Sequence, residues 1–161
     1  MTTGAMKLHG IPTTYKGTRT RSRLEAQWLC FLDLCGIEWL YEPFDCRGYI
    51  PDLLVGDRLV CEIKPFTWFV RDDGPIVEAR ERLRSVEGAY QTAILGLDPS
   101  ACELDGDRFS PRWEFRTADL YVRFGPVLGT KPLRFADSND FSKLWRIAGS
   151  RVRWKPTEAR P

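Results

Sequence analysis

Apolar residues recur with clear periods in the first part of the chain. A helical period covers about residues 20–35, and Gly36 follows as a C-terminal cap. The apolar stripe of this helix comprises Leu24, Trp28, Phe31, Leu32 and Cys35. Three short apolar runs, at about 37–44, 49–55 and 59–64, are typical of strands. The pattern therefore predicts one helix followed by three strands.

The periodicity continues to about residue 97. Residues 76–87 have apolar positions at helical spacing between charged ones, which predicts a second, amphipathic helix. Residues 91–97 are apolar and predict a central strand of the sheet. The order helix, strand, strand, strand, helix, strand predicts an α/β fold with a mixed sheet flanked by helices.

Beyond this core the pattern is weaker and predicts a C-terminal β/α extension, about residues 98–161. Asp105–Gly106 is typical of a hairpin turn, and residues 113–124 alternate like a strand. Residues 137–148 predict a helix that Gly149 ends, and residues 151–155 alternate basic and apolar side chains like a further strand. We expect a single domain over residues 1–161.

Composition excludes several classes of protein. No apolar run reaches the length of a membrane span and the N-terminus lacks a signal-peptide pattern, so we expect a cytoplasmic protein with no membrane partner. Five cysteines without a CxxC pair indicate reduced thiols. The only histidine, His9, lies near the N-terminus, which excludes sites built on histidine. Catalysis would have to rest on carboxylates, lysine, tyrosine and metal.

Three charged residues interrupt the most apolar part of the chain. Asp52, Glu62 and Lys64 lie in or beside the two strands predicted on either side of Gly56. Charged side chains are seldom fully buried unless they are paired or bind a metal. Glu62 and Lys64 are two positions apart and share a face of their strand. A structural carboxylate–lysine ion pair at the end of a sheet is the alternative to a functional site.

The length of the turn decides whether Asp52 joins this group. A two-residue loop would pair Asp52 with Cys61 and put Asp52 and Glu62 on opposite faces. A three-residue loop or a bulge, which Gly56 permits, would place Asp52 opposite Glu62. We predict the odd-length connection, because it gathers the three polar groups. Two carboxylates facing each other across a hairpin suit Mg²⁺ or Mn²⁺.

Pro51-Asp52, then nine residues, then Glu62-Ile63-Lys64 resembles the motif of the PD-(D/E)XK nucleases. The predicted order of elements over residues 20–97 is similar to the αβββαβ core of these restriction-endonuclease-like folds. Among them, the chain resembles small phage or transposon-end endonucleases. The resemblance implies a Mg²⁺-dependent DNA endonuclease, with Mn²⁺ able to substitute, that hydrolyses phosphodiester bonds through a metal-activated water. It also implies a bacterial or phage-infected host cell and a possible homodimer.

The same resemblance assigns roles to individual residues. Glu25, Asp52 and Glu62 are expected to bind the metal together with the carbonyl of Ile63, and Lys64 is expected to orient the water or stabilise the developing charge. Glu25 follows from Arg21-Ser-Arg-Leu-Glu25, which is similar to the acidic element on the family's first helix. From the residues alone, Glu25 lies at the edge of the apolar stripe, and the alternatives are that it extends to water or pairs with Arg21 on the same helical face.

Basic residues at both ends of the chain are candidates for contacts with DNA phosphates. They are Arg19, Arg21, Arg23, Arg151, Arg153 and Lys155. Residues 1–18 are polar and basic, and predict an irregular arm. Gln91 and Glu42 are lesser candidates, for a substrate contact and for a supporting role at the site. The rivals to a nuclease are a catalytically inactive nuclease-like module that binds DNA or protein, and a metal-independent domain whose acidic cluster is an ion-pair network.

Overall fold

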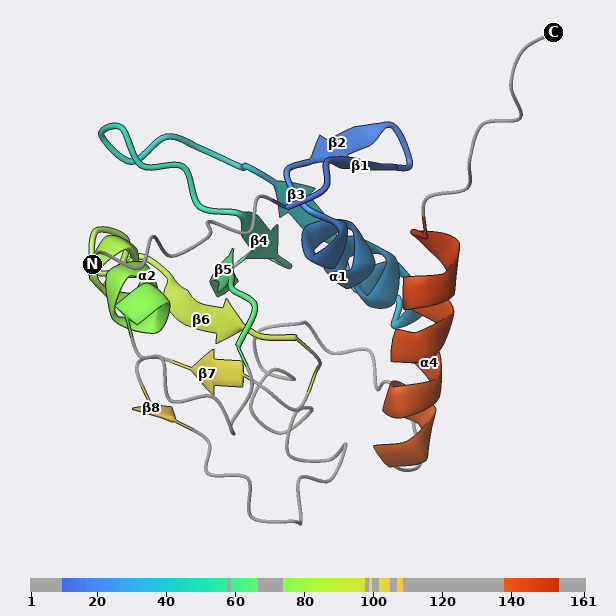
Figure 1. The fold of residues 1–161 in the computed structure, drawn as a ribbon. Helices are drawn as coiled ribbons and strands as arrows, with labels where there is room; N and C mark the ends of the chain where they lie inside the picture. Colours follow the sequence, from blue (N-terminus) through green and yellow to red (C-terminus); the bar gives the residue numbers. More distant parts are fainter. Residues whose placement is uncertain are drawn as a thin grey trace, which may run out of the picture.

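The computed structural model describes residues 10–57, 59–66, 74–97, 99, 102–104, 107–108 and 138–153. These residues form an α/β fold in which helices flank a mixed sheet (Figure 1). The helices are α1 (Arg23–Leu34), α2 (Gly74–Leu83) and α4 (Ser138–Arg151). No helix in the described ranges is both long and apolar enough to cross a membrane.

Six strands form the main sheet in the order in which they occur along the chain. They are β3 (Trp39–Tyr41), β4 (Leu53–Val55), β5 (Leu59–Ile63), β6 (Gln91–Leu95), β7 (Cys102–Leu104) and β8 (Asp107–Arg108). All neighbours are antiparallel except β5 and β6, which run parallel with α2 as their crossover. The predicted order from α1 to β6, the central place of β6 and the late hairpin are confirmed.

The connection between β4 and β5 has the odd length that we predicted. The last paired residues, Val55 and Leu59, leave three residues between them. Gly56 starts this turn with a φ of 59°, in the left-handed region that is accessible to glycine at little cost. Extended by one position beyond β4, the same register places Asp52 opposite Glu62.

Each face of the sheet carries its own hydrophobic core. Leu59, Cys61 and Ile63 of β5 belong to a buried cluster that includes residues of α1 and α4. Val60 points the other way and packs with α2. Both faces of β5 are therefore covered (Figure 1), which explains why all five of its residues are buried. A charged residue in this strand, Glu62, is consequently held away from bulk water.

Helix α1 begins at Arg23, three residues later than the periodicity predicts. Ser22 is its N-cap and accepts a hydrogen bond from the Glu25 N–H at 3.2 Å. Arg21 therefore lies before the helix and not on its face. This shift allows the Arg21 side chain to point away from the helix surface.

A β-hairpin precedes α1 where the sequence pattern predicts an irregular segment, so that prediction is wrong from residue 13 onward. The strands are β1 (Thr13–Tyr15) and β2 (Thr18–Thr20). Lys16 and Gly17 form the turn with φ angles of 45° and 79°, and turns of this kind match the twist of a hairpin.

Asp33 of α1 anchors this hairpin to the helix. Its carboxylate accepts hydrogen bonds from Tyr15 at 2.8 Å and from Trp39 at 3.0 Å, and pairs with Lys16 at 2.8 Å. Burial opposes the charge of Asp33, but these three donors outweigh burial and lower the pKa of the carboxyl group. Asp33 is thus a satisfied structural carboxylate.

The C-terminal helix differs from the prediction at its end. Helix α4 continues through Gly149 to Arg151. A Cβ built on Gly149 would lie 2.8 Å from Nε2 of Gln27, so glycine permits a close approach between α4 and α1. The prediction of a strand over 151–155 is wrong for its described part, residues 151–153, which end the helix. The rest of that segment, and the strand predicted at 113–124, lie outside the described residues.

Three of the five cysteines, Cys30, Cys35 and Cys61, are buried free thiols, and Cys46 is free and half-buried. This agrees with the prediction of reduced thiols for the cysteines whose side chains are described.

Candidate active site

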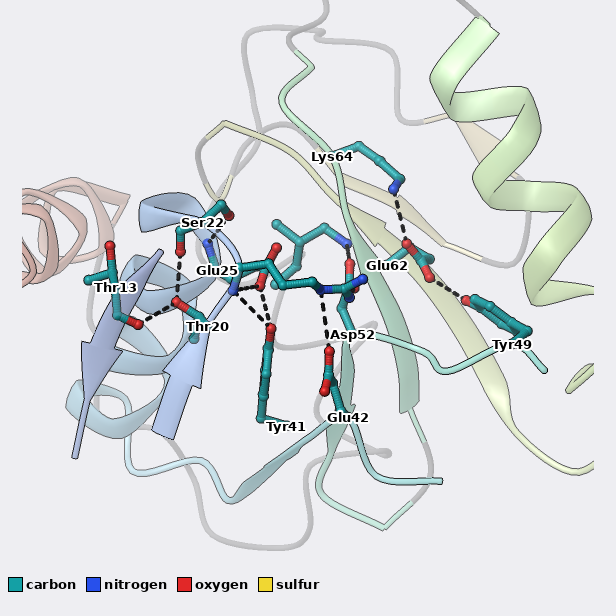
Figure 2. Close-up of polar contacts among 12 residues, drawn as sticks. Thr13, Thr20, Ser22, Glu25, Tyr41, Glu42, Tyr49, Asp52, Glu62 and Lys64 are labelled. Carbon is teal, nitrogen blue, oxygen red and sulfur yellow. Dashed lines mark hydrogen bonds and ion pairs between the residues drawn. The ribbon is translucent and has the colours of Figure 1, made fainter. Parts of the chain in front are cut away.

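Asp52 and Glu62 meet at one end of the β4–β5 hairpin. Asp52 lies directly before β4, and its Oδ2 accepts a hydrogen bond from the Ile63 N–H at 2.7 Å across the strand pair. Asp52 is 3% exposed and Glu62 is 2% exposed. Figure 2 shows Asp52 between Glu25 and Glu62. The structure therefore brings together the two carboxylates that we expected to face each other.

Glu62 is held by two donors. Its Oε1 accepts a hydrogen bond from the Tyr49 hydroxyl at 2.5 Å, and its Oε2 lies 3.3 Å from Nζ of Lys64. Burial and the neighbouring Glu62 raise the pKa of Tyr49, so the hydroxyl keeps its proton and remains a donor. Lys64 is more exposed than Glu62 and reaches the same carboxylate from the strand end (Figure 2).

Glu25 approaches the pair from the first turn of α1. Its Oε2 accepts hydrogen bonds from the Tyr41 hydroxyl at 2.6 Å and from the Arg21 N–H at 2.9 Å. Burial and then Glu25 raise the pKa of Tyr41 to about 12. Glu25 is buried, and its charge contributes to raising the pKa of Asp52. It thus acts both as part of a helix cap and as a third carboxylate beside Asp52.

Arg21 takes a place among these carboxylates. Its guanidinium pairs with Asp52 and lies 3.3 Å from Glu42. Burial works against the charge of the guanidinium, but Asp52, then Tyr41 and then Glu25 outweigh it and raise the pKa of Arg21. Glu42, a lesser candidate in the sequence, therefore belongs to the network through Arg21.

The environment of Asp52 favours its protonated form. Burial, followed by the charge of Glu62, raises the pKa of Asp52 to about 7, although the Ile63 N–H and Arg21 act in the opposite direction. Arg21 compensates only in part, because its side chain is 59% exposed and its charge is screened by water. A buried carboxylate whose pKa is displaced by its neighbours is typical of a functional site, and also occurs in ion-pair networks.

The charges in the cluster do not balance. Its four carboxylates are Glu25, Glu42, Asp52 and Glu62, and its two cations are Arg21 and Lys64. When all of them are ionised, two negative charges remain without a partner among these six groups. Three of these carboxylates, Glu25, Asp52 and Glu62, are buried, and carboxylate oxygens are the ligands that Mg²⁺ and Mn²⁺ prefer.

The cluster fits a divalent cation in its chemistry, but its carboxylates are at present occupied by protein donors. In the part of the chain that the structure describes, no group of three acidic, cysteine or histidine side chains is arranged to hold a metal ion. Arg21, Tyr41, Tyr49 and Lys64 occupy the oxygens instead. At Asp52 a cation would therefore compete with the Arg21 guanidinium.

Ile63 lies between Glu62 and Lys64 in sequence, and its N–H is already bound to Asp52. Its carbonyl as a metal ligand stays a prediction. Gln91 is not near this cluster, because it pairs with Leu59 at the far end of β5 and is exposed. The prediction that Gln91 lies close to the carboxylate site is therefore wrong.

The other basic candidates lie around the same end of the α1–α4 helix pair. Arg19 is exposed on β2 and Arg23 is exposed at the start of α1. Arg151 and Arg153 are exposed at the end of α4 that lies beside the first turns of α1. Lys155 lies outside the described residues.

Comparisons with protein families, with curated proteins and with solved structures found no match. The fold and the cluster thus define an α/β protein with a buried acidic site at a sheet end, and function has to be inferred from that site.

Proposed function

We propose that this protein is a metal-dependent DNA endonuclease with a PD-(D/E)XK-type site, of the kind found in phages and mobile elements. The observation that carries the proposal is the register of β4 and β5, which brings Asp52 opposite Glu62 with Lys64 at its side. The αβββαβ order of the elements around this hairpin supports it. So does Glu25, whose charge reaches Asp52 from the first helix.

In this proposal Asp52, Glu62 and Glu25 hold Mg²⁺, with the Ile63 carbonyl beside them. When bound, the cation lowers the pKa of a water molecule and offsets the charge of the phosphate. Lys64 supplies a further positive charge at the site, where it orients the attacking water or stabilises the charge that develops on the phosphate. Tyr41 and Tyr49 keep Glu25 and Glu62 in position through their hydroxyl groups.

DNA is the proposed substrate because exposed arginines lie around the start of α1, the helix that carries Glu25. Arg19 and Arg23 flank the Arg21 position on β2 and α1, and Arg151 and Arg153 lie at the adjacent end of α4. Arginines at these places suit contacts with the phosphate backbone, which position a duplex without reading its sequence.

A second candidate, a metal-independent domain with a structural ion-pair network, is favoured by one observation. The carboxylates of Asp52 and Glu62 both have protein donors on their two oxygens. In that case Mg²⁺ or Mn²⁺ would leave thermal stability unchanged, whereas a metal site would be stabilised by the cation it binds. An inactive module would bind DNA without cleaving it.

The test compares wild type with Asp52→Ala and Lys64→Ala on supercoiled, linear, single-stranded and branched DNA, in Mg²⁺, Mn²⁺ or EDTA. Glu81→Ala and Lys143→Ala serve as matched controls, because both side chains are exposed on helices outside the cluster. We expect cleavage only with metal, and a loss of about 100- to 1,000-fold in each site variant but not in the controls.

The outcomes separate the candidates. Normal cleavage by both Asp52→Ala and Lys64→Ala would show that the proposed site is wrong. Metal-dependent stabilisation and DNA binding without cleavage of any substrate would identify an inactive module. Circular dichroism of each variant ensures that a loss of activity does not come from unfolding.

A further inference from the structure

The main chain and the side chain of Arg21 contact different carboxylates. The Arg21 N–H donates to Glu25 at 2.9 Å, which fixes the backbone at this position. The guanidinium pairs with Asp52 and lies 3.3 Å from Glu42. Arg21 is the only described cation in contact with Asp52. The residue therefore supplies a positive charge at the place where the proposed function requires a metal ion.

The two partners in this ion pair differ in their exposure to solvent. The Asp52 side chain is 5% exposed and the Arg21 side chain is 59% exposed. The backbone next to Arg21 is held independently, because Thr20 is buried and its hydroxyl donates to Ser22 O at 2.8 Å. Arg21 can therefore leave Asp52 by side-chain rotation alone, toward the solvent from which DNA would approach.

We infer that Arg21 is an internal counter-ion that occupies the carboxylates in the metal-free protein and is released by Mg²⁺ to bind a phosphate of the substrate. The inference rests on the proposed function. It explains why the described carboxylates do not converge as metal ligands, since Asp52 is turned to the guanidinium. It also adds a role for Arg21, because the released guanidinium becomes a bidentate donor beside the site.

Mn²⁺ binding, followed by the electron paramagnetic resonance of the free ion, tests the first half of the inference. Wild type is compared with Arg21→Gln and Arg21→Lys, and with Arg23→Gln as the matched control on an exposed neighbour. Loss of a competing, largely exposed cation is expected to tighten Mn²⁺ binding by up to about fivefold in Arg21→Gln. Arg21→Lys should tighten it less, and Arg23→Gln should match wild type.

DNA binding tests the second half, in a Lys64→Ala background that keeps the DNA intact. The salt dependence of binding to a duplex is measured at fixed Mg²⁺ and again in EDTA. With Mg²⁺, Arg21→Gln should lower the slope of log K against log salt by about one phosphate contact. In EDTA it should leave the slope unchanged, because Arg21 is then engaged by Asp52. Any contribution of Arg23 should be the same in both conditions.

Each result decides one point. Unchanged Mn²⁺ affinity in Arg21→Gln, or a slope change that does not depend on Mg²⁺, overturns the counter-ion role while the nuclease proposal stands. Failure of wild type itself to bind Mn²⁺ overturns the proposed function and this inference with it. Folding of Arg21→Gln only in the presence of Mn²⁺ supports the inference, because a cation then replaces the missing guanidinium.

Discussion

Replacing Asp52 by asparagine separates a functional carboxylate from a structural one. Asparagine has nearly the same shape and can still accept the hydrogen bond from the Ile63 N–H, but it cannot ionise. The substitution also removes the ion pair with Arg21. Because that arginine is largely exposed, losing the pair costs at most about 1 kcal/mol.

The magnitude of the effect follows from the pKa of Asp52. Burial and Glu62 raise it from 3.8 to about 7 in the folded protein. The folded state therefore binds the proton more tightly than the unfolded state, so the ionised group destabilises the fold above the unfolded pKa. This difference corresponds to about 4 kcal/mol at about 1.36 kcal/mol per pH unit. The cost is absent below about pH 4 and complete above about pH 7.

We therefore expect Asp52→Asn to be more stable than wild type by about 4 kcal/mol at pH 7.5 in EDTA, because the raised pKa already includes the favourable charge of Arg21. Near pH 4 the two proteins should have similar free energies of unfolding. Urea denaturation followed by tryptophan fluorescence at several pH values measures this difference. Asp52→Asn should at the same time abolish the proposed metal binding, so Mn²⁺ should stabilise only wild type.

Asp33→Asn is the matched control, because its effect on the free energy of unfolding is expected to have the opposite sign. The pKa of Asp33 is lowered by its donors, so ionisation of this group stabilises the fold above the unfolded pKa, and that contribution is lost as the pH falls through the folded pKa. Asp33→Asn should therefore be less stable than wild type at pH 7.5. A destabilised Asp52→Asn at that pH would refute the reasoning, because Asp52 would then be a structural partner of Arg21.

Two further substitutions test the supports of the site. Tyr49→Phe removes a donor from the buried Glu62 carboxylate and should cost about 1.5 to 3 kcal/mol of unfolding free energy at pH 7.5, whereas Tyr90→Phe, whose ring stacks on Phe44, should change it little. Trp28→Phe removes the buried hydrogen bond from the indole to Gly96 O at 2.9 Å and should cost about 1 to 3 kcal/mol in the same urea assay. An unchanged midpoint in either variant would show that these bonds do not support the fold.

The hairpin at the centre of the site could be predicted because three local signals agree. Apolar residues marked both strands, Gly56 allowed a left-handed turn residue, and the polarity of Asp52 and Glu62 favoured the register that brings them together. Strand pairing with a short loop depends on sequence-local chemistry. The order of elements around it followed from hydrophobic periodicity in the same way.

The surroundings of the carboxylates could not be predicted, since they depend on the path of the backbone. The segment from β3 to β4 turns through three residues with positive φ, Glu42, Arg47 and Gly48, at 46°, 55° and 91°. That path decides which tyrosines reach Glu25 and Glu62. Tyr41 and Tyr49 were missed for this reason, although a tyrosine at each end of an irregular segment beside an acidic motif is a signal worth testing.

Two errors at helix ends have physical causes. Placing the start of α1 at residue 20 put Arg21 one turn before Glu25, whereas the Ser22 cap leaves Arg21 outside the helix and free to reach Asp52. Gly149 was expected to end the last helix, because glycine disfavours a helix interior by about 1 kcal/mol. Close packing against Gln27 outweighs that preference, and a contact between residues so far apart in the chain has no local signature.

Asp33 provides an example, within the same protein, of a carboxylate in a structural ion-pair network, with which Asp52 can be compared. Asp33 accepts from Tyr15 and Trp39 and pairs with a nearby lysine, and the pKa of its carboxyl group falls, as expected where donors are sufficient. Asp52 also has two donors, yet its pKa rises, first because the carboxyl group is deeply buried and then because Glu62 lies beside it, while its cation is exposed. A network that served stability alone would resemble the first arrangement. When it is ionised, the second has an excess of negative charge beside buried carboxylates, which a proton on Asp52 or a cation from outside these groups would neutralise, and this is why we favour a metal site over a structural one.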